Sequence, residues 1–440
     1  MTLEDGLYKV GLYTLGCKVS SYETEAVSEA FEREGFAVSS FEDVCDVYVI
    51  NTCTVTAESD AKSRKYIRRA IKRNPSAKVL VMGCYSQRAP AEVAEIDGVS
   101  AVVGTAGKLS VVDIAKRLLR GNTAGPVVSV GTLDGAEFER MIIRRAPRTR
   151  GYVKIEDGCD CSCSYCAISA ARGPVRSKPK EEIIEEVSSL YRSGTEEIVL
   201  TGIETGSYGK DFKNGYTLGD LLCELDGAGA CRRIRLGSMA PELVGRDFVE
   251  KIQGLSILVP HIHLSMQSGS DSVLAAMRRR YNRRMAIENI RRLREAVPGI
   301  TFTADLMVGF PGETQEDFAD TVSFVSEAML LDAHVFTYSR REGTDAAYMD
   351  GQISEREKKA RSAALIAEKN RVRELVLADI VERGEPLMTV FETGEDGRYT
   401  GHSDTYVEVL ADSKCDVRGK LLAVAPKRHD NGIIYGEIIT

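Results

Sequence analysis

The chain has 440 residues, a formal net charge of −7, 43% hydrophobic residues and 28% charged residues, which is typical of a soluble globular protein with two or three domains. It contains no apolar run of about 18 residues, which excludes a transmembrane helix, and its short acidic start, residues 1–6, is unlike a signal peptide. We therefore expect a cytoplasmic protein without a membrane partner, whose 11 cysteines are reduced or bind metal.

Strand and helix patterns alternate through residues 1–140. Short apolar runs predict four strands, at residues 8–15, 47–50, 78–82 and 99–103. Residues 21–34 place apolar side chains at helical spacing, with charged residues on the opposite face. This alternation predicts a small parallel α/β domain.

Three cysteines of this segment, Cys17, Cys53 and Cys84, each lie just past the carboxyl end of a predicted strand. The carboxyl ends of parallel strands share one edge of a sheet, where ligands bind. A single cysteine would be uninformative, because free cysteines are often buried in cores. Three cysteines at equivalent strand ends predict that the thiols converge.

A basic segment at residues 62–73 follows the second of these cysteines and contains no acidic residue. Taken alone, it is typical of a solvated helix face. Beside a nucleic-acid substrate it would be a candidate for phosphate contact, even though the net charge of the chain is negative.

Four cysteines fall within eight residues at the start of the central segment, namely Cys159, Cys161, Cys163 and Cys166. A disulfide cage is a poor explanation in a long chain without a secretory signal. The run indicates a metal or iron–sulfur site. A zinc site would usually pair two such knuckles, and no second close Cys/His pair lies nearby.

The spacing of Cys159, Cys163 and Cys166 resembles the signature of the radical S-adenosylmethionine (SAM) enzymes, with Tyr165 at the position of the usual aromatic residue. The resemblance implies that three thiolates hold three irons of a [4Fe-4S] cluster and leave the fourth iron open to SAM. A fourth protein ligand would close that position, so we interpret Cys161 as a bystander.

After this loop, residues 141–375 alternate between strands and helices in about six βα units. Pattern alone does not separate a partial barrel from a full eight-unit barrel, and the resemblance favours the partial (β/α)6 barrel of radical SAM enzymes. It also implies SAM contacts near the strand ends, for which the candidates are Glu204, Ser238, Gln267 and Asp305.

His261 and His263 have the spacing of a metal-ligand pair. We interpret them as a pair at a strand end, because a radical SAM site needs neither.

Residues 376–440 change to short strands, five in about 55 residues, which predicts a small OB-like β-barrel. The segment resembles the TRAM module of RNA-modifying enzymes, including the stretch 401–406. Barrels of this kind bind nucleic acid through stacking and charge. Further basic patches at residues 144–154 and 277–284 extend a possible phosphate track.

The surroundings of Cys17, Cys53 and Cys84 resemble the N-terminal domain of the methylthiotransferases, in which three such cysteines hold a second, auxiliary [4Fe-4S] cluster. The sequence from Gly16 to Val19 is most similar to the MtaB-type branch. One departure is that Ser20 and Ser21 stand where the family usually has Asn and Gln.

The resemblance implies a radical SAM enzyme that methylthiolates C2 of N6-threonylcarbamoyladenosine at position 37 of tRNA. Its partners would be the tRNA anticodon arm and an electron donor such as flavodoxin or ferredoxin. Two alternatives remain within the family, isopentenyladenosine in tRNA and an aspartate of a ribosomal protein. A non-catalytic, metal-containing RNA-binding protein is the alternative of another class.

Overall fold

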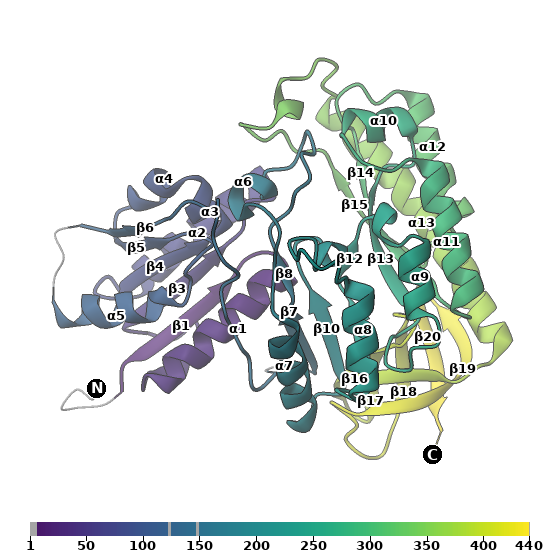
Figure 1. Cartoon of the computed structure of the whole chain (residues 1–440), viewed down its shortest axis with the longest axis horizontal. Helices are drawn as coiled ribbons and strands as arrows, with labels where there is room; N and C mark the ends of the chain where they lie inside the picture. The colour runs from purple at the N-terminus through teal and green to yellow at the C-terminus, as the bar shows by residue number, and fades with distance from the viewer. Residues whose placement is uncertain (1–6, 122–124, 147–148, 440) are drawn as a thin grey trace. The chain divides into compact units, whose positions relative to one another are not determined.

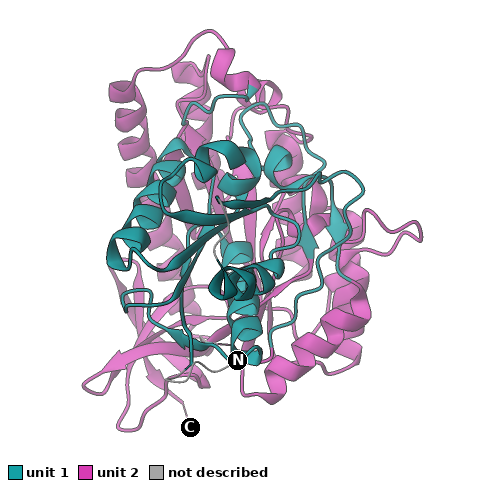
Figure 2. Ribbon diagram, turned by 90° about the vertical axis from the view of Figure 1, so that its left-hand side faces the viewer, with its two compact units in different colours: residues 1–143, 156–178, 339–344 teal, residues 144–155, 179–338, 345–440 magenta. Residues whose placement is uncertain are grey.

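The computed structural model describes residues 7–121, 125–146 and 149–439. The chain forms two compact units, coloured separately in Figure 2. Unit 1 consists of residues 1–143, 156–178 and 339–344, and unit 2 of residues 144–155, 179–338 and 345–440. The domain boundaries expected at residues 140 and 375 stay predictions.

Unit 1 is built on a parallel sheet whose strand order, within the described residues, is β2-β1-β3-β4-β5-β6. Its strands are β1 (Lys9–Thr14), β2 (Ala37–Ser39), β3 (Val47–Thr52), β4 (Lys78–Gly83), β5 (Val99–Val103) and β6 (Val127–Ser129). Its helices are α1 (Lys18–Arg33), α2 (Ala57–Arg73), α3 (Cys84–Arg88), α4 (Pro90–Ala94), α5 (Ser110–Arg120) and α6 (Ile168–Arg172). A short hairpin of β8 (Glu156–Asp157) and β9 (Arg176–Ser177) completes the unit.

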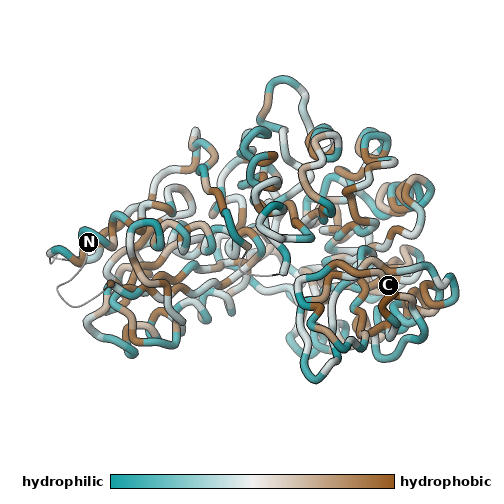
Figure 3. The backbone as a smooth tube through the Cα atoms, turned by 90° about the horizontal axis from the view of Figure 1, so that it is seen from below, coloured by the Kyte–Doolittle hydropathy of each residue, from teal (hydrophilic) through white to brown (hydrophobic). Residues whose placement is uncertain are grey.

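Alternating side chains of the central strands enter two separate hydrophobic clusters. Val47 and Val49 of β3 face one cluster with Phe31 of α1, whereas Tyr48 and Ile50 face the other with residues of α2. Two buried faces explain the nearly continuous apolar runs of these strands. Figure 3 shows how apolar (brown) and hydrophilic (teal) stretches alternate along the backbone.

Unit 2 contains two parallel sheets, with the orders β11-β10-β7 and β12-β13-β14-β15 (Figure 1). The strands are β7 (Arg150–Lys154), β10 (Glu197–Thr201), β11 (Ile234–Leu236), β12 (Ser238–Met239), β13 (His261–Gln267), β14 (Thr301–Val308) and β15 (Asp332–Thr337). The helices are α7 (Lys180–Arg192), α8 (Leu218–Gly227), α9 (Arg246–Ile252), α10 (Asp271–Ala276), α11 (Arg283–Ala296), α12 (Gln315–Glu327) and α13 (Glu355–Arg383). Because β12 continues β11 after Gly237, the two sheets form the predicted partial barrel, which confirms the fold class.

The C-terminal strands form the closed barrel β16-β17-β18-β20-β19, as predicted. Their bounds are β16 (Leu387–Glu395), β17 (Arg398–Ser403), β18 (Glu408–Asp412), β19 (Leu421–Asp430) and β20 (Ile433–Ile438). Helix α13 ends directly before them at Gly384, whose φ of 65° provides the left-handed cap that glycine adopts at low cost. None of the helices in the described ranges combines the length and apolar composition of a membrane span.

A buried charge network on the strands of the larger barrel reaches this small barrel through Arg150, which pairs with both Glu197 and Glu392. The Glu197 carboxylate contacts Arg233 Nε at 2.5 Å and Arg235 Nε at 2.8 Å. Burial raises the pKa of Glu197, but Arg235 and Arg233 outweigh it and hold that pKa at about 2. Removing one member of such a buried network leaves the other charges uncompensated.

The stretch 401–406, part of the resemblance to the TRAM module, packs against strands of the larger barrel instead of forming an open surface. Arg235 donates to the carbonyl of Ser403 at 2.9 Å, and Thr301 Oγ1 donates to the carbonyl of Thr405 at 2.5 Å. The Tyr406 ring stacks on His261 with 4.5 Å between centroids. Any RNA contact by the small barrel therefore needs residues outside the packed part of this stretch.

Candidate functional site

The structure brings the three N-terminal cysteines to one edge of the unit 1 sheet. Strands β1, β3 and β4 are neighbours, and the paired residues include Thr14 with Asn51 and Thr52 with Gly83. Cys17 is the N-cap residue of α1, and Cys84 is the first residue of α3. Cys53 directly follows β3. The expected convergence at the strand ends is therefore present in the fold.

Close packing around Cys53 requires a residue without a side chain at position 16. Gly16 has a φ of 119°, and a Cβ there would lie 3.1 Å from Cys53 Cβ and 3.3 Å from its Sγ. Ser20 stands at a position where the sequence departs from the family pattern. Its Oγ lies 3.8 Å from Cys17 Sγ. Gly16 thus allows the backbone before α1 to pack closely against Cys53.

The thiols act on one another electrostatically. Burial raises the pKa of Cys84 to about 11, against the opposing charges of Arg172 and Lys108, and burial also raises the pKa of Cys53. A charge on Cys17 adds to both increases. Iron binding at these residues would release protons, because the thiolate is the ligand form.

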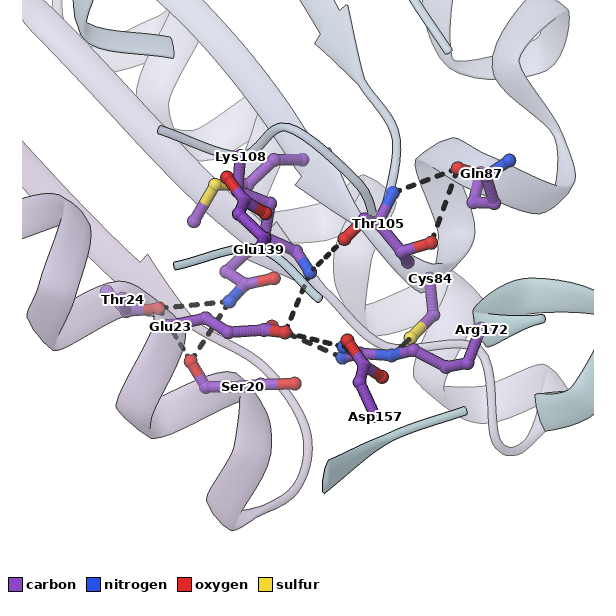
Figure 4. Close-up of polar contacts among 12 residues, drawn as sticks. Ser20, Glu23, Thr24, Cys84, Gln87, Thr105, Lys108, Glu139, Asp157 and Arg172 are labelled. Carbon is purple, nitrogen blue, oxygen red and sulfur yellow. Dashed lines mark hydrogen bonds and ion pairs between the residues drawn. The ribbon is translucent and has the colours of Figure 1, made fainter. Parts of the chain in front are cut away.

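Arg172 lies at the centre of the polar contacts next to Cys84 (Figure 4). Its side chain is fully buried, and its Nε donates to Cys84 Sγ at 3.1 Å. Its terminal nitrogens form two hydrogen bonds to Glu23, at 2.5 and 3.2 Å, and approach Asp157 at 3.3 Å. Lys108 Nζ contacts the same Glu23 carboxylate at 2.8 Å. Two buried cations and two carboxylates are therefore arranged around a thiol.

The loop with Cys159, Cys163 and Cys166 belongs to the same unit. The Cys159 N–H donates to the carbonyl of Gly173 at 2.9 Å, and the Cys166 N–H donates to the carbonyl of Cys163 at 3.1 Å. Both cysteines of this turn and Cys159 are partly buried. The loop is thereby held against the segment that follows α6.

Gly158, directly before the loop, has a φ of 90°, and a Cβ at this position would lie 1.9 Å from the carbonyl oxygen of Pro174. Only glycine fits such an approach. This close contact fixes where the chain enters the cysteine loop.

The expected SAM contacts all lie in unit 2. Glu204 is buried, and its Oε1 accepts a hydrogen bond from the Ala240 N–H at 2.9 Å. Ser238 pairs with His263 across β12 and β13, and Gln267 ends β13 with a φ of 68°. Asp305 lies on β14, between two histidines. The structure thus brings Ser238 and Asp305 to opposite sides of His263, whereas Glu204 contacts the backbone after β12.

Sequence reasoning missed Glu23, Lys108 and Asp157 as neighbours of the thiols. Glu23 had a detectable signal, because it falls within the apolar stripe of α1 that includes Val19 and Val27, where a charged residue needs a partner. Lys108 and Asp157 lie in loop and hairpin positions that carry no such periodic signal.

The basic segment predicted at residues 62–73 forms most of α2, and ion pairs neutralise part of it. Carboxylates of Glu42, Glu58 and Glu92 contact basic residues of this helix. Exposed basic side chains also remain on α2, at Lys65, Arg68 and Lys72. In the patch at residues 144–154, Arg150 and Lys154 have little exposure, so less of that patch is accessible to phosphate.

Comparisons with known proteins show which families and relatives this chain is similar to. The radical SAM superfamily profile matches residues 153–325, and the profile described as uncharacterized protein family UPF0004 matches residues 9–104. Over 94% of this chain and 93% of the relative, the sequence is 39% identical to threonylcarbamoyladenosine tRNA methylthiotransferase MtaB of Bacillus subtilis. It is 38% identical to the protein of the same name from Thermotoga maritima, over 80% of each chain.

Relatives with other names are less similar. A tRNA-2-methylthio-N(6)-dimethylallyladenosine synthase of Methylacidiphilum infernorum is 35% identical over 82% of this chain and 80% of its own. A ribosomal protein uS12 methylthiotransferase RimO of Pelotomaculum thermopropionicum is 32% identical over 90% of each. Among solved structures, the radical SAM methyltransferase TsrM from Kitasatospora setae shares the fold, with a TM-score of 0.57 and 17% identity over 78% of this chain and 77% of its own.

The partial parallel barrel and the loop of Cys159, Cys163 and Cys166 define the class of radical SAM enzymes. Within this class, the identity over nearly the whole chain is decisive. The chain belongs to the radical SAM methylthiotransferase family, and it is an enzyme that transfers a methylthio group.

We expect Arg172→Met to lower the free energy of unfolding of the metal-free protein by about 3–5 kcal/mol, because Glu23 and Asp157 would stay buried without their main counter-charge. Urea unfolding followed by circular dichroism measures the change. Arg64→Met is the matched control, since Arg64 and Glu92 form a partly exposed pair that contributes about 0–1 kcal/mol. Equal losses in the two variants would contradict the role given to Arg172.

Proposed function

We propose that this enzyme methylthiolates C2 of N6-threonylcarbamoyladenosine at position 37 of tRNA. The observation that carries the proposal is the 39% identity, over 94% of the chain, to a relative named for this reaction. The MtaB-type sequence from Gly16 to Val19, at the edge where the thiols converge, supports the same substrate.

Six cysteines would hold two [4Fe-4S] clusters, with Cys159, Cys163 and Cys166 binding the one that takes SAM. Cys17, Cys53 and Cys84 would bind the auxiliary cluster, and the contacts around them fit an anionic, thiolate-ligated group. The Arg172 guanidinium donates to Cys84 Sγ, and Lys108 adds a second buried cation. When bound, the first cluster supplies the electron that cleaves SAM, and the second supplies sulfur.

The protein's own groups hold these ligands in place. Arg172 connects the segment after the loop of Cys159, Cys163 and Cys166 to Cys84 and Glu23, so this segment and one thiol of the proposed auxiliary site share a buried ion network. Cys53 and Cys84 are buried whereas Cys17 is exposed, so water is excluded from one side of the proposed auxiliary site. Positioning of this kind, with exclusion of water, is the usual contribution of a protein to cofactor chemistry.

For SAM itself, the residues that we propose are Glu204, Ser238 and Gln267. Asp305, the fourth candidate from the sequence, is less suited because both of its carboxylate oxygens face histidines.

The proposed partners are the anticodon arm of tRNA and a one-electron donor such as flavodoxin or ferredoxin, and the proposed location is the cytoplasm. Exposed basic residues of α2 and the C-terminal barrel are the surfaces that we expect to contact phosphate. Two less similar relatives are named for dimethylallyladenosine in tRNA and for ribosomal protein uS12, so these are the second candidates for the substrate.

Nucleoside mass spectrometry of tRNA tests the substrate. We expect a strain lacking this gene to lose 2-methylthio-N6-threonylcarbamoyladenosine and to regain it when the wild-type gene is supplied. Loss of the 2-methylthio form of isopentenyladenosine, with the threonylcarbamoyl form unchanged, would assign the enzyme to the other tRNA substrate.

The two cysteine sets predict separable defects. Cys163→Ala should abolish reductive SAM cleavage, because it removes a ligand of the SAM-binding cluster. Cys53→Ala should keep cleavage to 5′-deoxyadenosine and lose thiolation. Cys45→Ala is a control, because Cys45 is buried in a hydrophobic cluster beside β3 and should affect neither. Chromatography of 5′-deoxyadenosine and of modified nucleosides from the same reaction measures both quantities, and an equal loss of both in Cys53→Ala contradicts this division.

A further inference from the structure

Three side chains that the proposed reaction leaves without a role meet on neighbouring strands of unit 2. His263 lies on β13, Asp305 on β14 and His334 on β15, and these strands pair in parallel in this order. In the registers, His263 is opposite Thr303, and Asp305 is opposite His334. The strands therefore supply a rigid scaffold for two imidazoles and one carboxylate.

The distances among these groups match a metal site. Asp305 Oδ2 lies 3.3 Å from His263 Nε2, and Asp305 Oδ1 lies 3.3 Å from His334 Nδ1. When one ligand atom is taken from each residue, the three atoms all lie within 4.8 Å of one another. Charge-assisted hydrogen bonds between nitrogen and a carboxylate are shorter, about 2.7–2.9 Å. Two ligands about 2.1 Å from a tetrahedral zinc ion are about 3.4 Å apart.

A second contact orients His263 for this role. Its Nδ1 lies 2.8 Å from Thr303 Oγ1, which fixes the ring so that Nε2 faces the Asp305 carboxylate. Metal-binding histidines commonly use their other ring nitrogen for such a hydrogen bond. The same hydroxyl lies 2.9 Å from His261 Nε2, so His261 is directed to Thr303 and Tyr406 and stands outside the group.

The side chains become more exposed from one end of the group to the other. His263 is 12% exposed, Asp305 27% and His334 78%, so one side of the group is open to solvent. Three protein ligands with an open side are typical of zinc sites that keep a position for water or a substrate oxygen. Imidazole and carboxylate ligands also suit other divalent transition metals.

We infer that His263, Asp305 and His334 bind a divalent transition-metal ion, and we choose Zn²⁺ as the ion for the test. The site is separate from the six cysteines in both residues and ligand chemistry, because it offers nitrogen and oxygen and no sulfur. Its open position accepts water or an anionic oxygen, such as that of a carboxylate. The inference does not depend on which substrate the enzyme thiolates.

Zinc titration of the full-length, cluster-loaded protein under anaerobic conditions tests the site. After a chelator wash, we expect wild-type protein to bind one Zn²⁺ per chain, measured by elemental analysis after gel filtration and by competition with a chromophoric chelator. His334→Gln should remove this stoichiometric binding, and its exposed position makes the substitution compatible with folding. Thr303→Val, which removes the orienting contact, should weaken binding by about 10–100-fold.

His429→Gln is the matched control. His429 also contacts a carboxylate, that of Glu374 at 2.8 Å, but the pair belongs to no such group of three, and this variant should bind zinc like the wild type. Zinc-edge X-ray absorption should show nitrogen and oxygen ligands at about 2.0–2.1 Å. Absence of stoichiometric zinc, sulfur ligands at about 2.3 Å, or equal binding by His334→Gln would each overturn the inference and leave the three side chains as an ion-paired group.

Discussion

Parallel pairing of β1, β3 and β4 is the constraint on which the site in unit 1 depends. Because these strands are neighbours and run in one direction, the residues that follow them emerge at one edge, although Cys17, Cys53 and Cys84 are far apart in the sequence. Local spacing supplies the other cysteine set, within a loop of eight residues. Long-range topology and short-range sequence thus bring two thiol sets to the same unit by different means.

Charge compensation is the second requirement, because thiolates and a bound cluster place negative charge in a buried environment. Arg172 donates to Cys84 Sγ, and the charges of Arg172 and Lys108 are in turn balanced by Glu23 and Asp157. Arg172 lies at the end of α6, the helix that follows the loop of Cys159, Cys163 and Cys166, so its contact with Cys84 connects that segment to the edge where the three N-terminal cysteines lie. In unit 2, the arginines around Glu197 form a comparable network, and they also bind residues of the C-terminal barrel.

Much of the fold could be predicted, because strand and helix periods are local properties and parallel strand ends always share an edge. The contacts between polar residues that lie far apart in the sequence could not be predicted. The spacing of His261 and His263 suggested a pair, but the register sends His261 to Tyr406 and brings Asp305 and His334 to His263. Likewise, the small barrel was expected to bind nucleic acid, and only the folded chain shows that Arg235 and Thr301 bind the backbone of its stretch 401–406.

Iron content and Mössbauer spectra of the anaerobically purified protein test the central claim most directly. Two [4Fe-4S] clusters predict about eight irons per chain in the wild type and about four in Cys84→Ala, which keeps only the cluster on Cys159, Cys163 and Cys166. About four irons in the wild-type chain, or about eight retained in Cys84→Ala, would contradict a second cluster at the strand ends of unit 1.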